Sequence, residues 1–334
     1  MNPALHRLAV TAAIVAFAVI VLGAYVRLSH AGLGCPDWPG CYGQLTWPDE
    51  THELAKANEA FPDRPVEPHK AWKEMVHRYL AGALVLLVLA LNFLAWKAEY
   101  RQAGVRVLAG ALLGLILFQA ALGMWTVTLK LLPIVVMAHL LGGLATFSML
   151  LWLSWRSSGR STAASARMLA PLRGVILTGM AVLILQVALG GWTSANYAAL
   201  ACPDLPTCQG QWWPEADFAD AFTVWREIGA DYEGGVLDQP ARAAIHLAHR
   251  IGAVLTFLVL AFLGARLLRV QPAMRAGVVL LVLLLAQVTL GVLNVALFLP
   301  LPNAVAHNGV AALLLAQMLW LTYRSRARRP TWYG

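Results

Sequence analysis

Apolar residues occur along this chain in long runs, separated either by short basic loops or by longer loops rich in acidic residues, Pro and Trp. A helix that spans a bilayer needs about 20 consecutive, mostly apolar residues. The sequence contains eight runs of about this length, so we predict eight transmembrane helices. Their expected ranges are 8–28, 72–96, 105–127, 133–155, 170–193, 242–265, 274–297 and 303–323.

Composition agrees with a membrane protein. Of the 334 residues, 59% are hydrophobic and 13% are charged, whereas soluble domains carry about 25% charged residues. The first apolar run is not followed by a small-residue cleavage site, so we expect it to remain as a helix and not to be removed as a signal peptide. The predicted fold class is therefore an all-α polytopic membrane protein.

Basic residues predict how the chain is oriented. In a topology of eight spans they fall in the short loops and at the two ends, all on one side, which should be the cytoplasm, with both termini there. The long loops 29–71 and 194–241 then face outward, toward the periplasm of a bacterial inner membrane. This placement explains the net charge of +8 without a nucleic-acid partner. The residues concerned are Arg7, Lys97, Arg101, Arg106, Arg156, Arg160, Arg167, Arg173, Arg266, Arg269, Arg275, Arg324, Arg326, Arg328 and Arg329.

The chain also contains an internal repeat. The segment Cys35-Pro-Asp-Trp-Pro-Gly-Cys41 returns as Cys202-Pro-Asp-Leu-Pro-Thr-Cys208, and Gln119-x-x-x-Gly123 returns at nearly the same offset as Gln287-x-x-x-Gly291. Four spans bring a chain back to its starting side, so the two copies have the same orientation. We expect two tandem, pseudo-symmetric four-helix bundles formed by residues 1–160 and 161–334.

Four histidines lie at matching places in the two copies, near the outer ends of their spans. His77 returns as His249, and His139 returns as His307. Ionisable residues are expensive inside a bilayer and usually functional there. Cofactors are often ligated between facing helices of a bundle, and imidazole is a standard axial ligand of haem iron. We therefore expect two bis-histidine haem sites, with another metal, a proton relay or a role as hydrogen-bonded packing residues as the alternatives.

The residues around these histidines fit a flat macrocycle. Glycine allows a ring to approach a helix backbone, and an arginine at the water-facing end of a helix can pair with haem propionates. His246, one turn before His249, is a candidate hydrogen-bond partner of a ligand histidine, proton acceptor or alternate ligand. The glycines concerned are Gly82, Gly142, Gly143, Gly252 and Gly309, and the candidate arginines are Arg27, Arg78 and Arg250.

Glu74 distinguishes the first copy from the second. It lies one turn before His77 on the same helical face, and the second copy has His246 in its place. A buried carboxylate beside a macrocycle can accept a proton or stabilise a developing cation. The first half is thus the candidate for chemistry and the second for a resident cofactor. The alternative is that Glu74 only pairs with Arg78, Lys70 or Lys73.

The four cysteines form two pairs in the outward loops, each pair enclosing five residues. Disulfides form and persist on the outer face of a bacterial inner membrane. A local structural disulfide in each loop is one interpretation of this spacing. Redox exchange with a thiol carrier and metal binding are the others.

Taken together, these motifs resemble the haem A synthase family over nearly the whole chain. The resemblance rests on the segment Gly23-Ala-Tyr-Val-Arg27 through Cys35-Pro-Asp-Trp-Pro, on Glu74-x-x-His77-Arg78, and on the histidines of spans four, six and eight. It implies oxidation of the C8 methyl group of haem O to a formyl group by successive hydroxylations, which gives haem A for terminal oxidases.

The resemblance also implies roles for individual residues. His77 and His139 would flank the substrate haem, His249 and His307 would ligate a haem b, and Glu74 would be the acidic residue beside the substrate. Cys35 and Cys41 match the cysteine pair of the family's outer loop, and Cys202 and Cys208 form a second pair.

Two other functions use the same features: a di-haem b electron-transfer cytochrome, and a haem carrier or transporter. The expected partners are membrane lipid, a haem O synthase, terminal oxidase assembly factors, an electron acceptor that the sequence does not identify, and a second copy of the chain in a homo-oligomer.

Overall fold

The computed structural model describes residues 3–97, 103–158 and 163–326, and these residues are almost entirely helical outside the long loops. Eight of the helices are long and apolar enough to cross a membrane, which confirms the predicted multi-pass helical class. Arg101, Arg160, Arg328 and Arg329, and the expected boundary at 160/161, lie outside the described residues.

The long helices coincide with the predicted spans to within a few residues at most ends. They are α1 (Pro3–Leu28), α3 (Pro68–Trp96), α4 (Ala103–Thr128), α5 (Pro133–Ser157), α7 (Arg173–Ala195), α9 (Gln239–Leu268), α10 (Met274–Ala296) and α11 (Leu301–Arg324). A short helix, α6 (Ala163–Leu169), and a 3-10 turn (Ala170–Leu172) lead into α7.

Proline marks the start of every long helix that begins at the loop end carrying the cysteines. Pro68, Pro133, Pro240 and Pro302 lie in the first turns of α3, α5, α9 and α11. At that position the missing N–H costs no helical hydrogen bond and the fixed φ suits the helix. Polar residues in these first turns, such as Lys70 and Lys73 in α3, explain why apolar runs underestimate the helix lengths.

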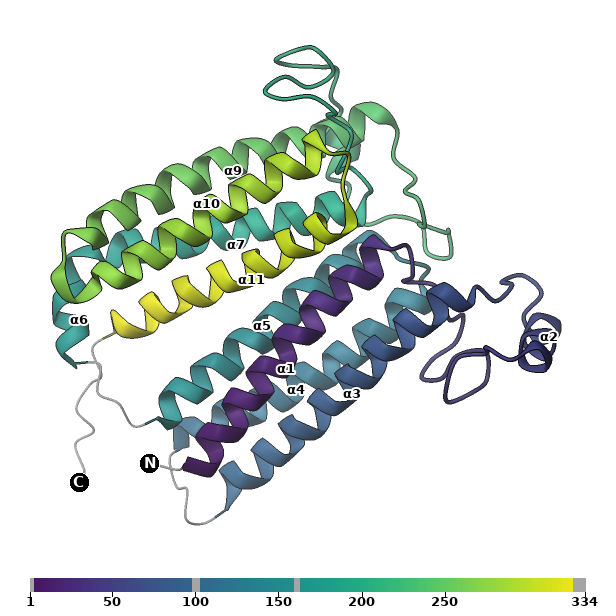
Figure 1. Cartoon of the computed structure of the whole chain (residues 1–334), viewed down its shortest axis with the longest axis horizontal. Helices are drawn as coiled ribbons and strands as arrows, with labels where there is room; N and C mark the ends of the chain where they lie inside the picture. The colour runs from purple at the N-terminus through teal and green to yellow at the C-terminus, as the bar shows by residue number, and fades with distance from the viewer. Residues whose placement is uncertain (1–2, 98–102, 159–162, 327–334) are drawn as a thin grey trace.

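The long helices pack in two groups of four, which can be followed in Figure 1. In the first group α1 and α4 each contact both α3 and α5, and in the second α7 and α10 each contact both α9 and α11. Thus α3 and α5 lie on opposite corners of one bundle, and α9 and α11 on opposite corners of the other. Contacts of α1 with α11, and of α5 with α7 and α11, join the groups.

The joined helices bury a continuous apolar core. Small residues on α1 allow close helix approach: Ala9, Ala12, Ala13 and Ala16 are all almost completely buried. Large apolar side chains such as Leu86, Phe93 and Leu258 instead point away from the protein, as expected for surfaces that face lipid.

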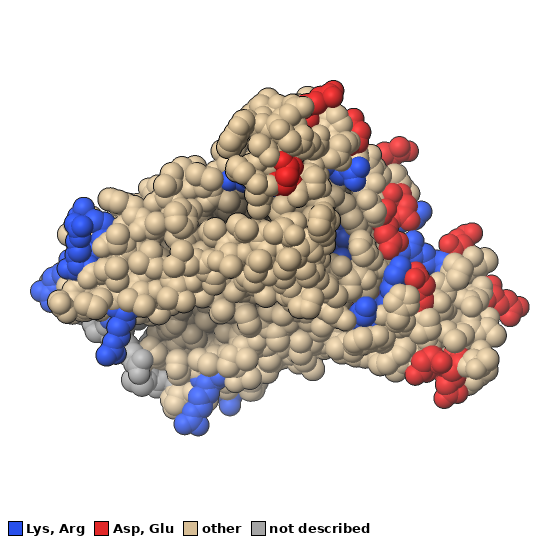
Figure 2. All heavy atoms as spheres, turned by 45° about the horizontal axis from the view of Figure 1, so that its top comes forward, with Lys and Arg blue, Asp and Glu red and all other residues tan. Residues whose placement is uncertain are grey.

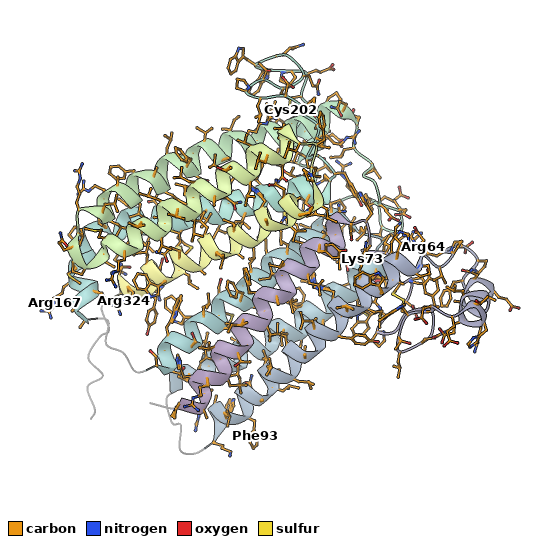
Figure 3. The ribbon with its side chains drawn as sticks, in the orientation of Figure 1. Arg64, Lys73, Phe93, Arg167, Cys202 and Arg324 are labelled. Atoms are coloured by element: carbon orange, nitrogen blue, oxygen red, sulfur yellow. A yellow bond between two sulfur atoms is a disulfide. The ribbon has the colours of Figure 1, made fainter. Side chains whose placement is uncertain are left out.

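The two ends of the helices differ in charge. On the face that Figure 2 shows, the charged side chains of the described residues at one end are Lys and Arg, whereas the Asp and Glu residues gather at the other end, around the long loops. Figure 3 places Arg167 and Arg324 at the basic end, and Arg64 and Cys202 at the opposite end. The start of α1 and the end of α11 both lie at the basic end (Figure 1).

The long loops contain two short helices that the hydrophobic pattern did not predict. These are α2 (Thr51–Ala60) and α8 (Phe218–Ala221). A capping box between Glu50 and Glu53 begins α2, and the Asp217 carboxylate accepts the Asp220 N–H at the start of α8. Both helices are too short to resemble a span, so only their capping residues could have indicated them.

Candidate functional site

The four predicted histidines occupy the acidic, loop-bearing end of their helices. His77 belongs to α3, His139 to α5, His249 to α9 and His307 to α11, and each side chain is half-buried. His77 and His139 lie within range of a direct electrostatic interaction, and so do His249 and His307. Because α3 and α5, and likewise α9 and α11, are diagonal in their bundles, each pair faces across a bundle interior.

Each imidazole lies against a glycine of the neighbouring helix. A Cβ added to Gly23 on α1 would lie 3.0 Å from His77 Cε1, and one on Gly123 of α4 would lie 3.5 Å from His139 Cε1. In the second bundle a Cβ on Gly190 or Gly291 would lie 3.2 Å from Cε1 of His249 or His307. A side chain at Gly23, Gly190 or Gly291 would crowd its ring, and a Cβ at Gly123 would lie at van der Waals distance, so all four glycines are in contact with an imidazole. We call them the contact glycines.

The contact glycines are not the glycines expected from sequence to lie beside the rings. A Cβ on Gly142 would lie 1.8 Å from Gln119 Nε2, and one on Gly252 would lie 2.3 Å from Gln186 Oε1, so these two make room for glutamine side chains. Gly82 has no neighbour within 4 Å of such a Cβ among the residues that the structure describes. The sequence identifies a histidine's neighbours along its own helix, but the ring lies against a different helix.

Two histidines contact glutamine amides. Gln186 Nε2 lies 3.1 Å from His249 Nδ1 and donates to the His249 carbonyl at 3.1 Å. Gln287 Nε2 lies 3.2 Å from His307 Nε2. In the sequence, the Gln-x-x-x-Gly segments at 119–123 and 287–291 mark the internal repeat. Their four-residue spacing places both residues on one helical face, and this spacing is the sequence signal for their presence in the site.

Three of the histidines retain unused hydrogen-bonding capacity. The Nδ1 atoms of His77, His139 and His307 are buried without a hydrogen-bond partner among the described residues. Buried polar atoms are normally paired, so these imidazole nitrogens are available to a bound group. Paired imidazoles across a bundle interior, each against a glycine, fit bis-histidine ligation of a haem.

Glu74 is buried at the junction between α3 and the first cysteine loop. One carboxylate oxygen accepts the Cys35 N–H at 3.0 Å, and the other accepts from Arg78 Nη2 at 2.5 Å. The glutamate side chain is 6% exposed. The pairing with Arg78, the alternative to a chemical role, is therefore present, and Lys70 instead pairs with Glu67 and Glu233.

His246 occupies the corresponding place in the second half. Its Nδ1 accepts the Cys202 N–H at 3.4 Å, and its side chain is buried. Glu74 and His246 thus bind the N–H of the first cysteine of each loop. Glu74 also forms an ion pair with the arginine one turn later on its own helix.

Arg78 and Arg250 bind the backbone of the cysteine loops. Arg78 Nη1 donates to the carbonyls of Asp37 and Pro39, at 2.9 and 3.3 Å, and to that of Gly40. Arg250 donates to the carbonyls of Cys202, Asp204 and Thr207, at 2.8 to 2.9 Å. Each arginine directly follows a histidine in sequence, and its guanidinium group attaches a cysteine loop to the helix. The pairing of these arginines with haem propionates stays a prediction.

Arg27 lies between the two halves. It donates to the carbonyls of Ser194 and Ala195, at 2.6 and 3.4 Å, near the end of α7. Its guanidinium also stands 4.0 Å from the centre of the Tyr197 ring. These contacts place Arg27 against the second half, and its pairing with haem propionates stays a prediction.

Both cysteine pairs form disulfides, Cys35–Cys41 and Cys202–Cys208, and the structure describes no free cysteine. The four residues are buried. Each loop closes with the same backbone pattern, in which the second cysteine pairs with the glutamine three residues later. The local bridges expected from the spacing are confirmed.

Comparison with known proteins supports the resemblance over nearly the whole chain. The family described as cytochrome oxidase assembly protein (COX15-CtaA) matches residues 6–319. A protein of Shewanella oneidensis named Heme A synthase is 52% identical over 91% of this chain and 92% of its own length. Proteins of the same name from Caulobacter vibrioides and Paracoccus denitrificans are 31% and 30% identical, each over 94% of this chain and over 93% and 85% of their own lengths. The chain therefore belongs to the cytochrome oxidase assembly family that contains these haem A synthases.

Proposed function

We propose that this protein is a haem A synthase, a membrane oxidoreductase that converts the C8 methyl group of haem O to the formyl group of haem A. Family membership and the names of the similar proteins support this activity. The observation that carries it at the level of the site is the duplicated histidine pair with a buried carboxylate beside one copy only.

The first bundle is the proposed substrate site. His77 and His139 would hold haem O between α3 and α5, and Glu74 lies one turn from His77. A carboxylate fixed by two donors is preorganised, and a preorganised negative group stabilises positive charge that develops as the methyl group is oxidised. We assign this catalytic role to Glu74.

The second bundle is the proposed site of a resident haem b, held by His249 and His307. When bound, this haem would supply electron transfer. The protein here offers two rings in contact with glutamine amides and no carboxylate at the place of Glu74, where His246 lies instead. These differences favour retention of a cofactor over chemistry on it.

The pseudo-symmetric organisation is proposed from contacts between corresponding residues. Arg27 binds Ser194, His30 stacks on Tyr197, and Tyr323 binds the carbonyl of Trp155. In each contact, the separation of the two residues along the sequence equals the offset between the two copies of the repeat. Equivalent residues meet when two similar units are related by a two-fold axis, here between halves 1–160 and 161–334.

The separation of charges supports the proposed orientation. The basic end, where α1 begins and α11 ends (Figures 1 and 2), would face the cytoplasm. The disulfide loops would then face the periplasm, where disulfides persist. In this arrangement both histidine pairs lie near the periplasmic surface, within reach of water and of an external electron acceptor. A haem O synthase and the terminal oxidase are the proposed supplier and recipient of haem.

The experiment that tests the activity is haem extraction and chromatography. Membranes containing the wild type or Glu74→Gln would be supplied with haem O. The amide can still accept the Cys35 N–H, which limits damage to the loop. We expect haem A from the wild type, and unchanged haem O or a hydroxylated intermediate from the variant. Glu59→Gln, an exposed acid of α2, is the matched control and should behave as the wild type.

Other outcomes would identify the competing functions. A wild type that holds two low-spin haems and returns haem O unchanged would be an electron-transfer cytochrome. One that takes up and releases either haem without changing it would be a carrier.

A further inference from the structure

Glutamine lies one turn before three of the four contact glycines. Gln119 precedes Gly123 on α4, Gln186 precedes Gly190 on α7, and Gln287 precedes Gly291 on α10. Residues four apart share a helical face, so each glutamine lies on the face that meets a histidine. On α1 the corresponding residue before Gly23 is Val19.

The glutamine at His249 is held in place from two sides. Its Nε2 contacts both Nδ1 and the backbone carbonyl of His249. The side chain fits because residue 252 is glycine: a Cβ there would lie 2.3 Å from Gln186 Oε1. Gln186 Oε1 is itself buried without a partner among the described residues, so the amide can offer either a donor or an acceptor to the ring.

The other two glutamines lie beside the second histidine of each pair. Gln287 contacts His307. Gln119 fits against Gly142, where a Cβ would lie 1.8 Å from its Nε2, and that amide nitrogen is buried without a partner in the described part of the chain. Both bundles therefore carry an amide near this histidine. The bundles differ at the first histidine, where His249 has Gln186 and His77 has Val19.

This difference concerns how firmly a ligand histidine is held. A hydrogen bond to the second ring nitrogen orients a metal-ligating histidine, and loss of such a partner costs about 10- to 100-fold in metal affinity. His77 Nδ1 is buried with no partner among the residues that the structure describes. Valine can pack against a ring but cannot orient it by hydrogen bonding.

We propose that Gln186 is a positioning residue that makes the His249–His307 site retain its haem, and that Val19 leaves the His77–His139 site able to exchange haem. The proposal rests on the proposed function, since it assumes haem at both histidine pairs. The difference between the corresponding residues Gln186 and Val19 then distinguishes a site that keeps a resident cofactor from a site whose substrate must enter and leave.

Haem-loss kinetics test this assignment. Purified protein loaded with haem b at both sites would be mixed with excess apomyoglobin, and haem transfer followed by absorbance. The variants His77→Ala and His249→Ala identify which kinetic phase of haem loss belongs to which histidine pair. We expect the fast phase to belong to the His77–His139 site. Gln186→Leu should accelerate the slow phase by about tenfold or more and leave the fast phase unchanged. Val19→Gln should slow the fast phase.

Gln317→Leu is the matched control, because Gln317 donates to the Ala276 carbonyl between α11 and α10 and should leave both rates unchanged. The proposal is overturned if Gln186→Leu leaves the slow phase at the wild-type rate, or if Val19→Gln leaves the fast phase unchanged. The assay uses haem b and involves no oxidation, so its result is independent of whether haem O becomes haem A. A change in the low-spin electron paramagnetic resonance signal of Gln186→Leu would show directly that the ring has reoriented.

Discussion

At the scale of single residues, Glu74 and His246 make the same contact with different chemistry. Each accepts the backbone N–H of the first cysteine of its loop, from Cys35 or Cys202. The structural task is thus shared by a carboxylate and an imidazole. What Glu74 adds is a negative charge, and this separates its proposed catalytic role from its role in holding the loop.

Glu74→His tests that separation by giving the first half the residue of the second. The imidazole should still accept the Cys35 N–H, so we expect haem content close to that of the wild type. Haem A production should fall by at least about 100-fold, the low end of the contribution of a positioned acid or base. Haem chromatography and a haemochrome assay measure the two quantities. Wild-type haem A production by this variant would remove Glu74 from the mechanism.

At the scale of elements, each cysteine loop is a closed unit organised by one aspartate. The Asp37 carboxylate accepts the N–H groups of Tyr42 and Gly43, at 2.6 and 2.7 Å. Tyr42 has φ of 53° and Gly43 of 75°, so the turn is left-handed and needs these bonds to hold it. Asp204 makes the same contacts with Gln209 and Gly210.

Asp204 makes the second loop sensitive to acid. Its hydrogen bond from Thr207, and those from the loop N–H groups, hold the pKa of the Asp204 carboxyl below its ordinary value. A lowered pKa in the folded state stabilises the loop above the ordinary aspartate pKa, and this stabilisation is lost as the pH falls through the lowered value. We therefore expect the rate at which a phosphine reduces Cys202–Cys208, relative to its rate with an unstructured disulfide peptide at the same pH, to rise as the pH falls through that range.

Asp204→Asn should remove this dependence, because the amide does not titrate. The variant should show faster reduction already at neutral pH and a flat profile toward acid. Glu215→Gln, an exposed acid in the same loop, is the control. A variant profile that still rises with acid would assign the effect to another group.

At the scale of the whole molecule, the two halves are joined at the loop end by two unlike sets of polar contacts. Arg64 pairs with Asp231 at 3.3 Å and with Glu233 at 2.5 Å, and these side chains are 25% to 45% exposed. Arg27 instead inserts between helices, against the carbonyl of Ser194 and the ring of Tyr197. Exposed ion pairs contribute little because water and salt screen them.

Arg27→Met should therefore destabilise the protein more than Arg64→Met. We expect a loss of about 2 kcal/mol for Arg27→Met, the scale of a hydrogen bond from a charged donor, and less than about 1 kcal/mol for Arg64→Met. Only the Arg64→Met effect should disappear at a salt concentration of about 1 M, which shortens the Debye length to about 3 Å. Thermal unfolding in detergent at low and high salt measures both. Equal, salt-sensitive losses would place the main contact between the halves in the loops.

The sequence by itself determined the membrane-spanning helices and the matching positions of the histidines, and it favoured local disulfides that the structure then showed. These features depend on residues that are close in sequence. A helix in lipid must form all of its backbone hydrogen bonds within itself. The tertiary structure decided which helices are diagonal, that Gly23 and Gly190 are the glycines against the rings, and that Arg27 joins the halves. Spans that are apolar on all sides give no periodicity to show which face turns inward. The partners of a side chain are then fixed only by how the helices pack.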